Sequence, residues 1–182
     1  MAVHLIYETH SRTIDNERGI ATGWLQGELS PSGRDFAVEL GRRWQDTELA
    51  AVYTSDLRRA VQTAEIAFAD RALPVLSDRR LRECNYGVLN GMPVARLEAE
   101  RAQHVDSPYP DGQSYRQVVD QMRSFLRDVA PRHQNQTILL IAHSANRWAL
   151  QCLLEGKALE ALLDAPFDWQ PGWRFTVPDT WS

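Results

Sequence analysis

The chain has 182 residues, of which 43% are hydrophobic and 24% are charged, and its formal net charge is −4 at pH 7. This length and apolar share suit one globular domain with a buried core and exclude a disordered chain. Twenty basic residues against 24 acidic ones argue against a nucleic-acid binder that relies on a broad positive face. No run of about 18 apolar residues is present, so no membrane span is expected.

The cysteines and the first residues of the chain bear on its compartment. Cys84 and Cys152 are too few for a disulfide framework, which favours a reducing environment. The stretch Met1–His4 lacks a basic segment followed by an apolar one, so no secretory signal is predicted. We therefore expect a cytoplasmic protein with a single domain over residues 1–182. An edge strand of its sheet would permit a homodimer.

Short apolar runs alternate along the chain with amphipathic stretches. In chain order, the predicted elements are a strand at 3–7, a helix from Ser30, a strand at 50–54, a helix at 57–68, a helix from Ser114 to Pro131, a strand at 137–142, a helix from about Ser144 and a strand at 173–177. In the helix from Ser30, the apolar residues Phe36, Ala37, Leu40 and Trp44 recur at helical spacing. Ser114 with Gln117 has the capping-box form. This alternation predicts a single three-layer α/β domain with a mainly parallel central sheet and helices on both faces.

Three polar segments stand at the carboxyl ends of predicted strands. His10 follows the first strand, Ser55 and Asp56 follow the second, and His143 ends the strand at 137–142. Ligands of such sheets bind beyond the carboxyl ends of the strands, so we expect these segments to meet at one edge. His143 also precedes a predicted helix, whose free N–H groups would favour a bound anion.

Two further kinds of charged group are candidates for the same site. Arg58 and Arg59 open the helix after the second strand, where a guanidinium would suit a phosphate. Adjacent helical residues point about 100° apart, so one of the two is expected to face solvent. Glu83 lies among apolar and aromatic neighbours, which would raise its pKa toward that of a proton donor. An ion pair of Glu83 with Arg80 or Arg82 is the alternative.

In their order along the chain, these motifs resemble those of the histidine phosphatase superfamily, the phosphoglycerate-mutase-like fold. The similar segments are His10–Asn16, Thr22–Trp24, Ser55–Ala64, Leu81–Gly87, Asp111–Ser114 and Ile141–Ser144. The segment Ser55–Ala64 is the most specific match. The resemblance implies a phosphatase that needs no metal or cofactor and acts on a small phosphorylated metabolite through a phosphohistidine intermediate.

The resemblance also implies a role for each matching residue. His10 is the implied nucleophile, Arg59 and His143 hold the phosphate, and Glu83 protonates the leaving oxygen. The other implied substrate-binding residues are Arg12, Asn16, Thr22, Gly23, Trp24 and Ser144.

The first motif departs from the family pattern, because Thr9-His10-Ser11 stands where the family has Arg-His-Gly. The nucleophile is retained and its neighbouring arginine is lost, which removes a phosphate contact worth about 1.5–3 kcal/mol. Arg12 either returns a guanidinium to the site or is a surface charge. Two alternatives to the phosphatase stay open. One is a repurposed or catalytically weakened member that binds an anionic ligand or performs other chemistry, and the other is a phosphomutase.

Overall fold

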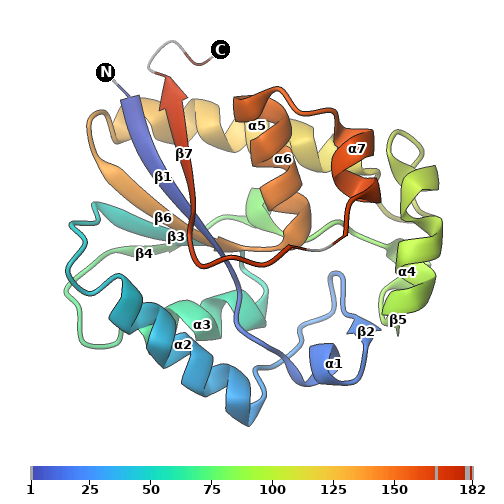
Figure 1. The fold of residues 1–182 in the computed structure, drawn as a ribbon, viewed down its shortest axis with the longest axis horizontal. Coiled ribbons are helices and arrows are strands. Elements are labelled where there is room, and N and C mark those ends of the chain that lie inside the picture. Colours follow the sequence, from blue (N-terminus) through green and yellow to red (C-terminus); the bar gives the residue numbers. More distant parts are fainter. Residues whose placement is uncertain (1, 167, 179–180, 182) are drawn as a thin grey trace.

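The structure, a computed structural model, describes residues 2–166, 168–178 and 181. In this part of the chain, a five-stranded sheet lies between two layers of helices (Figure 1). The strands are β1 (Ala2–Thr9), β2 (Ile20–Ala21), β3 (Ala51–Thr54), β4 (Val75–Ser77), β5 (Met92–Pro93), β6 (Thr137–Ala142) and β7 (Trp173–Pro178). The α-helices are α1 (Ile14–Glu17), α2 (Pro31–Arg43), α3 (Arg58–Ala67), α4 (Val94–Glu100), α5 (Tyr115–Val129), α6 (Ser144–Glu155) and α7 (Leu159–Asp164). Short 3₁₀ turns are η1 (Arg79–Leu81), η2 (Gly87–Leu89), η3 (Arg101–His104) and η4 (Ala130–Arg132).

The large sheet has the strand order β4-β3-β6-β1-β7. Its first four strands are parallel, and β7 pairs antiparallel with β1 at the edge. Thr9 at the end of β1 lies opposite Ala142 at the end of β6. The carboxyl ends of β1, β3 and β6 therefore meet at one edge of the sheet. The predicted fold class, a three-layer α/β domain with a mainly parallel sheet, is confirmed.

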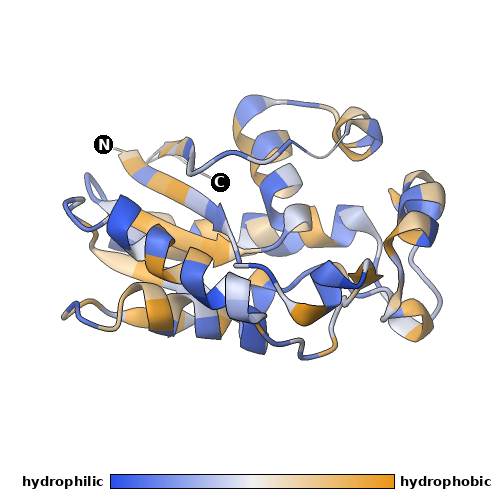
Figure 2. Ribbon diagram, turned by 60° about the horizontal axis from the view of Figure 1, so that its bottom comes forward, coloured by the Kyte–Doolittle hydropathy of each residue, from blue (hydrophilic) through white to orange (hydrophobic). Residues whose placement is uncertain are grey.

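Both faces of the sheet are covered, because alternate strand residues point into two separate cores. Leu5 and Leu140 belong to the core beneath α5 and α6. Ile6 and Leu139 belong to the core beneath α2 and α3. Figure 2 shows the central strands as mainly hydrophobic, whereas the helices carry hydrophilic and hydrophobic residues side by side. None of the described helices has the length and apolar character that a membrane span requires.

Local hydrogen bonds explain why the long helices begin where the sequence predicts. The Ser30 hydroxyl accepts a hydrogen bond from the Gly33 N–H at the start of α2, over 3.1 Å. Ser114 and Gln117 form both bonds of the predicted capping box at the start of α5. The helix expected from about Ser144 begins there.

Phe36 corrects one detail of the predicted pattern, because it is 46% exposed instead of buried. It lies on the side of α2 that faces a cavity at the end of β1, where no core residues cover it. The sequence also did not predict β2, β4, β5, α1, α4 or α7. Each of these elements has seven residues or fewer, which is too short to show a clear hydrophobic period.

Candidate active site

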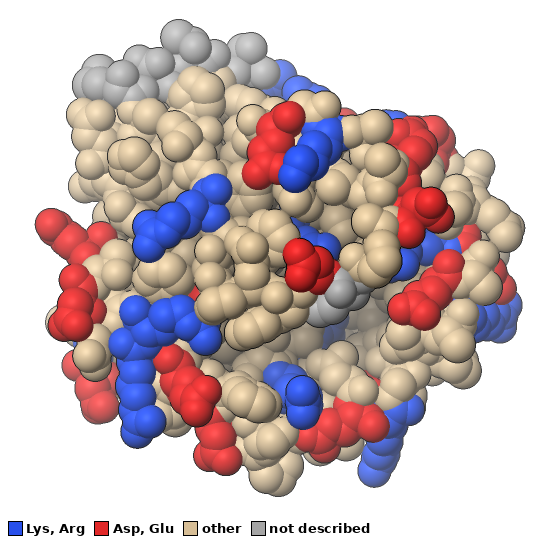
Figure 3. Space-filling view, in the orientation of Figure 1, with Lys and Arg blue, Asp and Glu red and all other residues tan. Residues whose placement is uncertain are grey.

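The polar segments that follow β1, β3 and β6 converge on a cavity of about 750 Å³. His10, Arg59 and Glu83 line it, together with residues of α2 on one side and of α4 on the other. In Figure 3 the surface is hollowed between the elements α6 and α7 above and α1 below, and side chains of both charges border the hollow. The predicted meeting of these segments at one edge of the sheet is therefore present in the structure.

His10 follows β1, and the backbone fixes the orientation of its ring. Nδ1 lies 2.7 Å from the carbonyl oxygen of Ser11, so Nδ1 is assigned the proton and Nε2 keeps its lone pair. Burial, and secondly the charge of Arg59, lower the pKa of His10 from 6.5 to about 3. The ring is thus neutral at pH 7, which is the state that a nucleophile requires.

His143 lies beside His10, with 5.0 Å between the ring centroids. Its Nε2 lies 2.7 Å from the Ser55 hydroxyl, which also accepts a hydrogen bond from the Leu57 N–H. We assign the proton of His143 to Nδ1, so that Nε2 accepts from the Ser55 hydroxyl. This Nδ1 is buried and has no hydrogen-bond partner in the described part of the chain. An unpaired buried donor costs about 1–3 kcal/mol, so an acceptor atom bound here would be stabilised.

Arg59 is held rigidly at the floor of the cavity. Its Nη1 donates to the carbonyl oxygen of Leu25 over 3.0 Å, and its Nη2 donates to that of Gly23 over 2.8 Å. The Nε group donates to Nε2 of His10 over 3.3 Å. Arg59 is 2% exposed, whereas Arg58 pairs with a glutamate on the surface. The prediction that one of the two arginines faces solvent is confirmed.

Glu83 lines the cavity, and burial raises the pKa of its carboxyl group above the ordinary value. Hydrogen bonds from the backbone N–H groups of Cys84 and Ala145, together with the charge of Arg59, act in the opposite direction. The Cys84 bond to Oε1 measures 2.8 Å. A carboxyl group in such a position can hold a proton and release it, as a general acid and base must.

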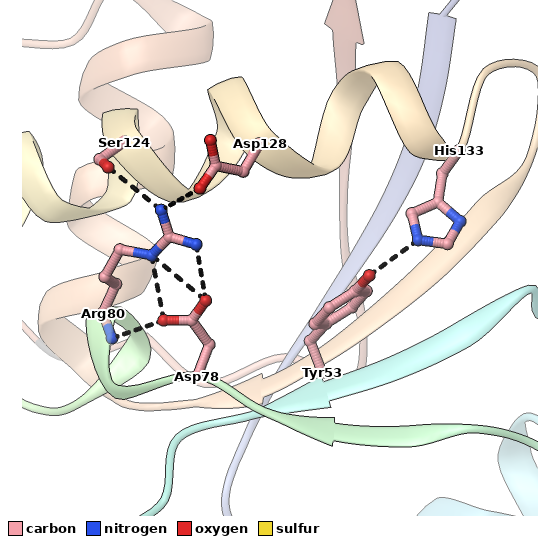
Figure 4. A network of polar contacts seen from close by, with 6 residues as sticks. All are labelled: Tyr53, Asp78, Arg80, Ser124, Asp128 and His133. Atoms are coloured by element: carbon pink, nitrogen blue, oxygen red, sulfur yellow. Dashed lines mark hydrogen bonds and ion pairs between the residues drawn. The ribbon is translucent and has the colours of Figure 1, made fainter.

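The arginines near Glu83 in the sequence have other carboxylate partners. Arg80 pairs with Asp78 and Asp128, as Figure 4 shows. Arg82 pairs with the carboxylate of Asp56 through two hydrogen bonds of 2.6 Å each. Within the described residues, neither arginine forms an ion pair with Glu83, so the alternative considered from the sequence is wrong.

Five of the six predicted substrate-binding residues line the cavity. They are Arg12, Asn16, Thr22, Gly23 and Ser144. The Arg12 guanidinium lies 5.3 Å from the centroid of the Phe36 ring at the exposed side of the cavity. The Asn16 side chain accepts a hydrogen bond from the Thr13 N–H at the start of α1.

The Trp24 ring is not brought into the cavity. Its Nε1 donates to the backbone oxygen of Glu83 over 2.6 Å, and the guanidinium of Arg82 lies 4.6 Å from the ring centroid. The ring lines a neighbouring pocket of about 550 Å³ instead. Trp24 therefore braces the segment that carries Glu83.

Thr9 and Ser11, the two residues of the first motif that differ from the family pattern, make structural contacts. The Thr9 hydroxyl lies 3.4 Å from that of Tyr7, which donates to the backbone oxygen of His143. The Ser11 hydroxyl donates to the backbone oxygen of Gly33, and its N–H donates to the Thr63 hydroxyl. Ser11 thus ties the His10 segment to α2 and α3.

Five charged residues that line the cavity were not singled out in the sequence, namely Glu8, Glu39, Arg43, Glu98 and Arg101. Glu8 is 2% exposed and accepts hydrogen bonds of 2.7 Å from Arg43 and from Trp44. Arg101 lines the opposite wall. Glu8 could have been singled out, because it is a charged residue inside the apolar run of β1. Arg43 and Arg101 had none, because most arginines at the ends of amphipathic helices face solvent.

The α/β fold thus brings His10, His143 and Arg59 together at the carboxyl edge of its sheet. Residues 9–170 match the family described as the histidine phosphatase superfamily (branch 1), so the chain belongs to this superfamily. It is accordingly an enzyme of the histidine phosphatase type.

Known proteins similar to this chain include both phosphatases and mutases. "Putative phosphoserine phosphatase 2" of Hydrogenobacter thermophilus is 32% identical over 167 residues, which cover 87% of this chain and 82% of that protein. The "2,3-bisphosphoglycerate-dependent phosphoglycerate mutase" of an Arthrobacter species is 29% identical over 201 aligned positions, which cover 89% of this chain and 81% of that protein. Among solved structures, "Bacillus stearothermophilus YhfR" has a TM-score of 0.81 at 28% identity and covers 93% and 88% of the two chains. Phosphatase or mutase activity is therefore the activity of this group.

Proposed function

We propose that this chain hydrolyses small phosphate monoesters through a phosphohistidine formed on His10. The observation that carries the proposal is the state of the two histidines. His10 is neutral with a lone pair on Nε2, and His143 offers a buried N–H without a partner among the described residues, with the ring centroids 5.0 Å apart. In this arrangement His10 would attack phosphorus, and the Nδ1–H of His143 would donate to a phosphoryl oxygen.

The reaction divides into two displacements at phosphorus. In the first, Nε2 of His10 forms a bond to phosphorus, the bond to the leaving oxygen breaks, and Glu83 gives its proton to that oxygen. In the second, the Glu83 carboxylate takes a proton from water, the water oxygen bonds to phosphorus, and the nitrogen–phosphorus bond breaks. The enzyme thereby returns to its starting state, and one difficult step becomes two easier ones.

Fixed positive groups stabilise the charge that collects on the phosphoryl oxygens. The backbone carbonyls of Leu25 and Gly23 hold the guanidinium of Arg59 in place before the substrate binds. The Nδ1–H of His143 and the N-terminus of α6, where Ser144 lines the cavity, are the other donors. Phosphoryl transfer depends mainly on such positioning and electrostatics, so this mechanism requires no metal ion.

The length of the chain favours hydrolysis over the mutase reaction. The alignment with the Arthrobacter mutase needs 201 positions, more than the 182 residues of this chain. The mutase therefore has insertions that this chain lacks. A mutase must protect its phosphoenzyme from water, and fewer covering segments make this protection harder.

The proposal is tested with p-nitrophenyl phosphate and a panel of phosphorylated metabolites, assayed with EDTA present. We expect phosphate release that EDTA does not inhibit. Quenching in base, which preserves phosphohistidine, followed by mass spectrometry should place a phosphoryl group on His10. Interconversion of monophosphate isomers without phosphate release would show a mutase. Ligand-induced thermal stabilisation without any product would show a binding protein, and either result would refute the phosphatase.

Comparison of Arg59→Ala with Arg12→Ala decides whether Arg12 replaces the missing motif arginine. Arg59 is buried against His10, and its loss should lower kcat/KM by about 100-fold or more. Arg12 is exposed beside Phe36, so its loss should cost only about three- to tenfold through weaker attraction of the anion. Equal losses in the two variants would instead give Arg12 the substitute role.

A further inference from the structure

Glu83 lies on a segment that no regular secondary structure holds in place. Residues 82–86 follow η1 and belong to no helix or strand. The hydrogen bonds of a helix or a sheet therefore do not fix the position of the Glu83 carboxyl group. A displacement of about 1 Å in an active site can lower the rate by about 100-fold. Side chains from other parts of the chain have to supply the missing restraint.

Two successive carbonyl oxygens of this segment accept hydrogen bonds from such side chains. The oxygen of Arg82 accepts one from Nδ2 of Asn146 over 3.2 Å, and Oδ1 of Asn146 accepts one from the N–H of His143 at the start of α6. The oxygen of Glu83 accepts a hydrogen bond from Nε1 of Trp24 over 2.6 Å. The first bond ties the segment to the His143 motif, and the second holds the backbone of Glu83 itself.

A charged clamp, formed by Asp56 and Arg82, holds the Trp24 ring in turn. The guanidinium of Arg82 lies 4.6 Å from the centroid of this ring, in a cation–π contact. The same guanidinium binds both carboxylate oxygens of Asp56 over 2.6 Å each, and this bidentate pairing sets its plane. Asp56 directly follows Ser55, whose hydroxyl contacts Nε2 of His143. The clamp therefore links the Trp24 loop to the segment that follows β3.

We propose that Trp24 is a positioning residue for the general acid Glu83, and that Asp56 and Arg82 hold its indole ring for this task. Trp24 lines the neighbouring pocket and not the cavity that holds His10, so it acts through the Glu83 backbone and does not touch the substrate. The inference rests on the proposed role of Glu83 and adds a residue outside the cavity on which the proton transfer depends.

Phenyl phosphate and p-nitrophenyl phosphate test the inference, because they have similar shapes but phenolate depends far more on a proton to leave. The value of kcat/KM reports the formation of the phosphoenzyme, in which the leaving group departs. Trp24→Phe keeps a ring beneath Arg82 and loses the indole N–H. It should lower kcat/KM by about 5- to 30-fold for phenyl phosphate and by less than about twofold for p-nitrophenyl phosphate. Equal losses for the two esters would refute the positioning role.

A double-variant cycle with Glu83→Gln shows whether Trp24 acts through Glu83. Without the acid there is nothing for the indole to position, so adding Trp24→Phe should change kcat/KM for phenyl phosphate by less than about twofold. Losses that multiply would refute the inference. Arg82→Lys keeps a cation beside Trp24 and Asp56, so it should retain more activity on phenyl phosphate than Arg82→Met. The opposite order would contradict the clamp.

Trp173→Phe is the matched control. The guanidinium of Arg147 lies 4.7 Å from the centroid of the Trp173 ring, but Trp173 lies on β7 and does not line the cavity. This variant should leave the ratio of the two esters at the wild-type value. A ratio that moves as far as in Trp24→Phe would refute a specific role of Trp24. A thermal melt of each variant confirms that the fold is retained.

The surroundings of the Glu83 carboxyl group allow a measurement that does not depend on turnover. Burial raises its pKa, and the charges of Arg59 and Arg101 act in the opposite direction. The buried phenols of Tyr7 and Tyr86 also act on it, and burial raises their own pKa, so both are neutral at pH 7. Trp24→Phe alters none of these groups. A changed pKa of Glu83 in this variant therefore reports a changed position or solvation of its carboxyl group.

Titration of Glu83 by NMR, with carboxyl-labelled glutamate, separates this inference from the proposed function. The Glu83 signal is assigned by its absence in Glu83→Gln. In Trp24→Phe the loosened segment should admit water, so the raised pKa should move back toward the ordinary value, whereas Trp173→Phe should leave it unchanged. A wild-type protein that hydrolyses neither ester refutes the proposed function. The titration still decides the role of Trp24 in that case, because an unchanged pKa in Trp24→Phe refutes it.

Discussion

Replacement of His10 by asparagine should abolish phosphatase turnover. Its Nε2 carries the lone pair of the ring, because Nδ1 donates its proton to the backbone oxygen of Ser11. The hydrogen bond that Nε2 accepts from Arg59 must break when Nε2 attacks phosphorus. Without this nucleophile the two-step route is closed, although Arg59 still binds phosphate. We expect kcat for p-nitrophenyl phosphate to fall by at least about 10⁴-fold, the scale of loss when a covalent nucleophile is removed.

His4→Asn provides a matched control for this measurement. His4 lies on the same strand, β1, and is exposed to solvent. Its replacement should leave both kcat and the phosphoenzyme yield at the wild-type level. In His10→Asn the base-stable phosphoenzyme should vanish together with turnover. Retention of more than a few per cent of kcat in His10→Asn would show that another group attacks phosphorus.

Glu83→Gln should slow hydrolysis of alkyl phosphates by about 10²- to 10⁴-fold, the usual contribution of a general acid. An alkoxide leaves poorly unless it is protonated, and the Glu83 carboxyl lines the cavity with a pKa that burial raises. p-Nitrophenolate leaves without a proton, so formation of the phosphoenzyme from p-nitrophenyl phosphate should be nearly unaffected. A burst of p-nitrophenol measured by stopped flow isolates this first step.

The pH dependence gives an independent test of Glu83. Burial raises the pKa of its carboxyl group, and the protonated form is the one that is active in the first step. The rate of phosphoenzyme formation from an alkyl phosphate should therefore fall as the pH rises through this raised pKa. Glu83→Gln should remove that limb, whereas Glu65→Gln on the exposed side of α3 should retain it. Equal losses for alkyl and aryl esters would place Glu83 in phosphate binding instead.

The parts of the fold that depend on local interactions could be predicted from the sequence. The run 137–142 is apolar throughout, because β6 is covered on both faces, and the structure has a strand there with the predicted bounds. Ser30 and Ser114 cap helices through bonds to residues three positions later. The motifs and their order along the chain could be recognised as well, because each motif is a short continuous segment.

Individual side-chain contacts between distant segments could not be predicted in the same way. Phe36 has the spacing of a core residue, but the cavity beside α2 leaves it exposed. Trp24 lies in the expected loop, but its ring turns toward Arg82 because the Glu83 backbone accepts its N–H. Arg101 could not be distinguished from a surface arginine until Trp148 was found against it.

The sequence by itself determined the layers of the domain and the candidates for the reacting groups. The hydrophobic period and helix capping depend on residues a few positions apart in the chain, so the sequence shows them directly. Only the tertiary structure decided the protonation states and the electrostatic partners of those groups. The neutral ring of His10, the unpaired Nδ1 of His143 and the separation of Glu83 from Arg80 depend on burial and on charges brought close from far along the chain. Coulombic and desolvation energies depend on distance in space, and that distance is set when the whole chain has folded.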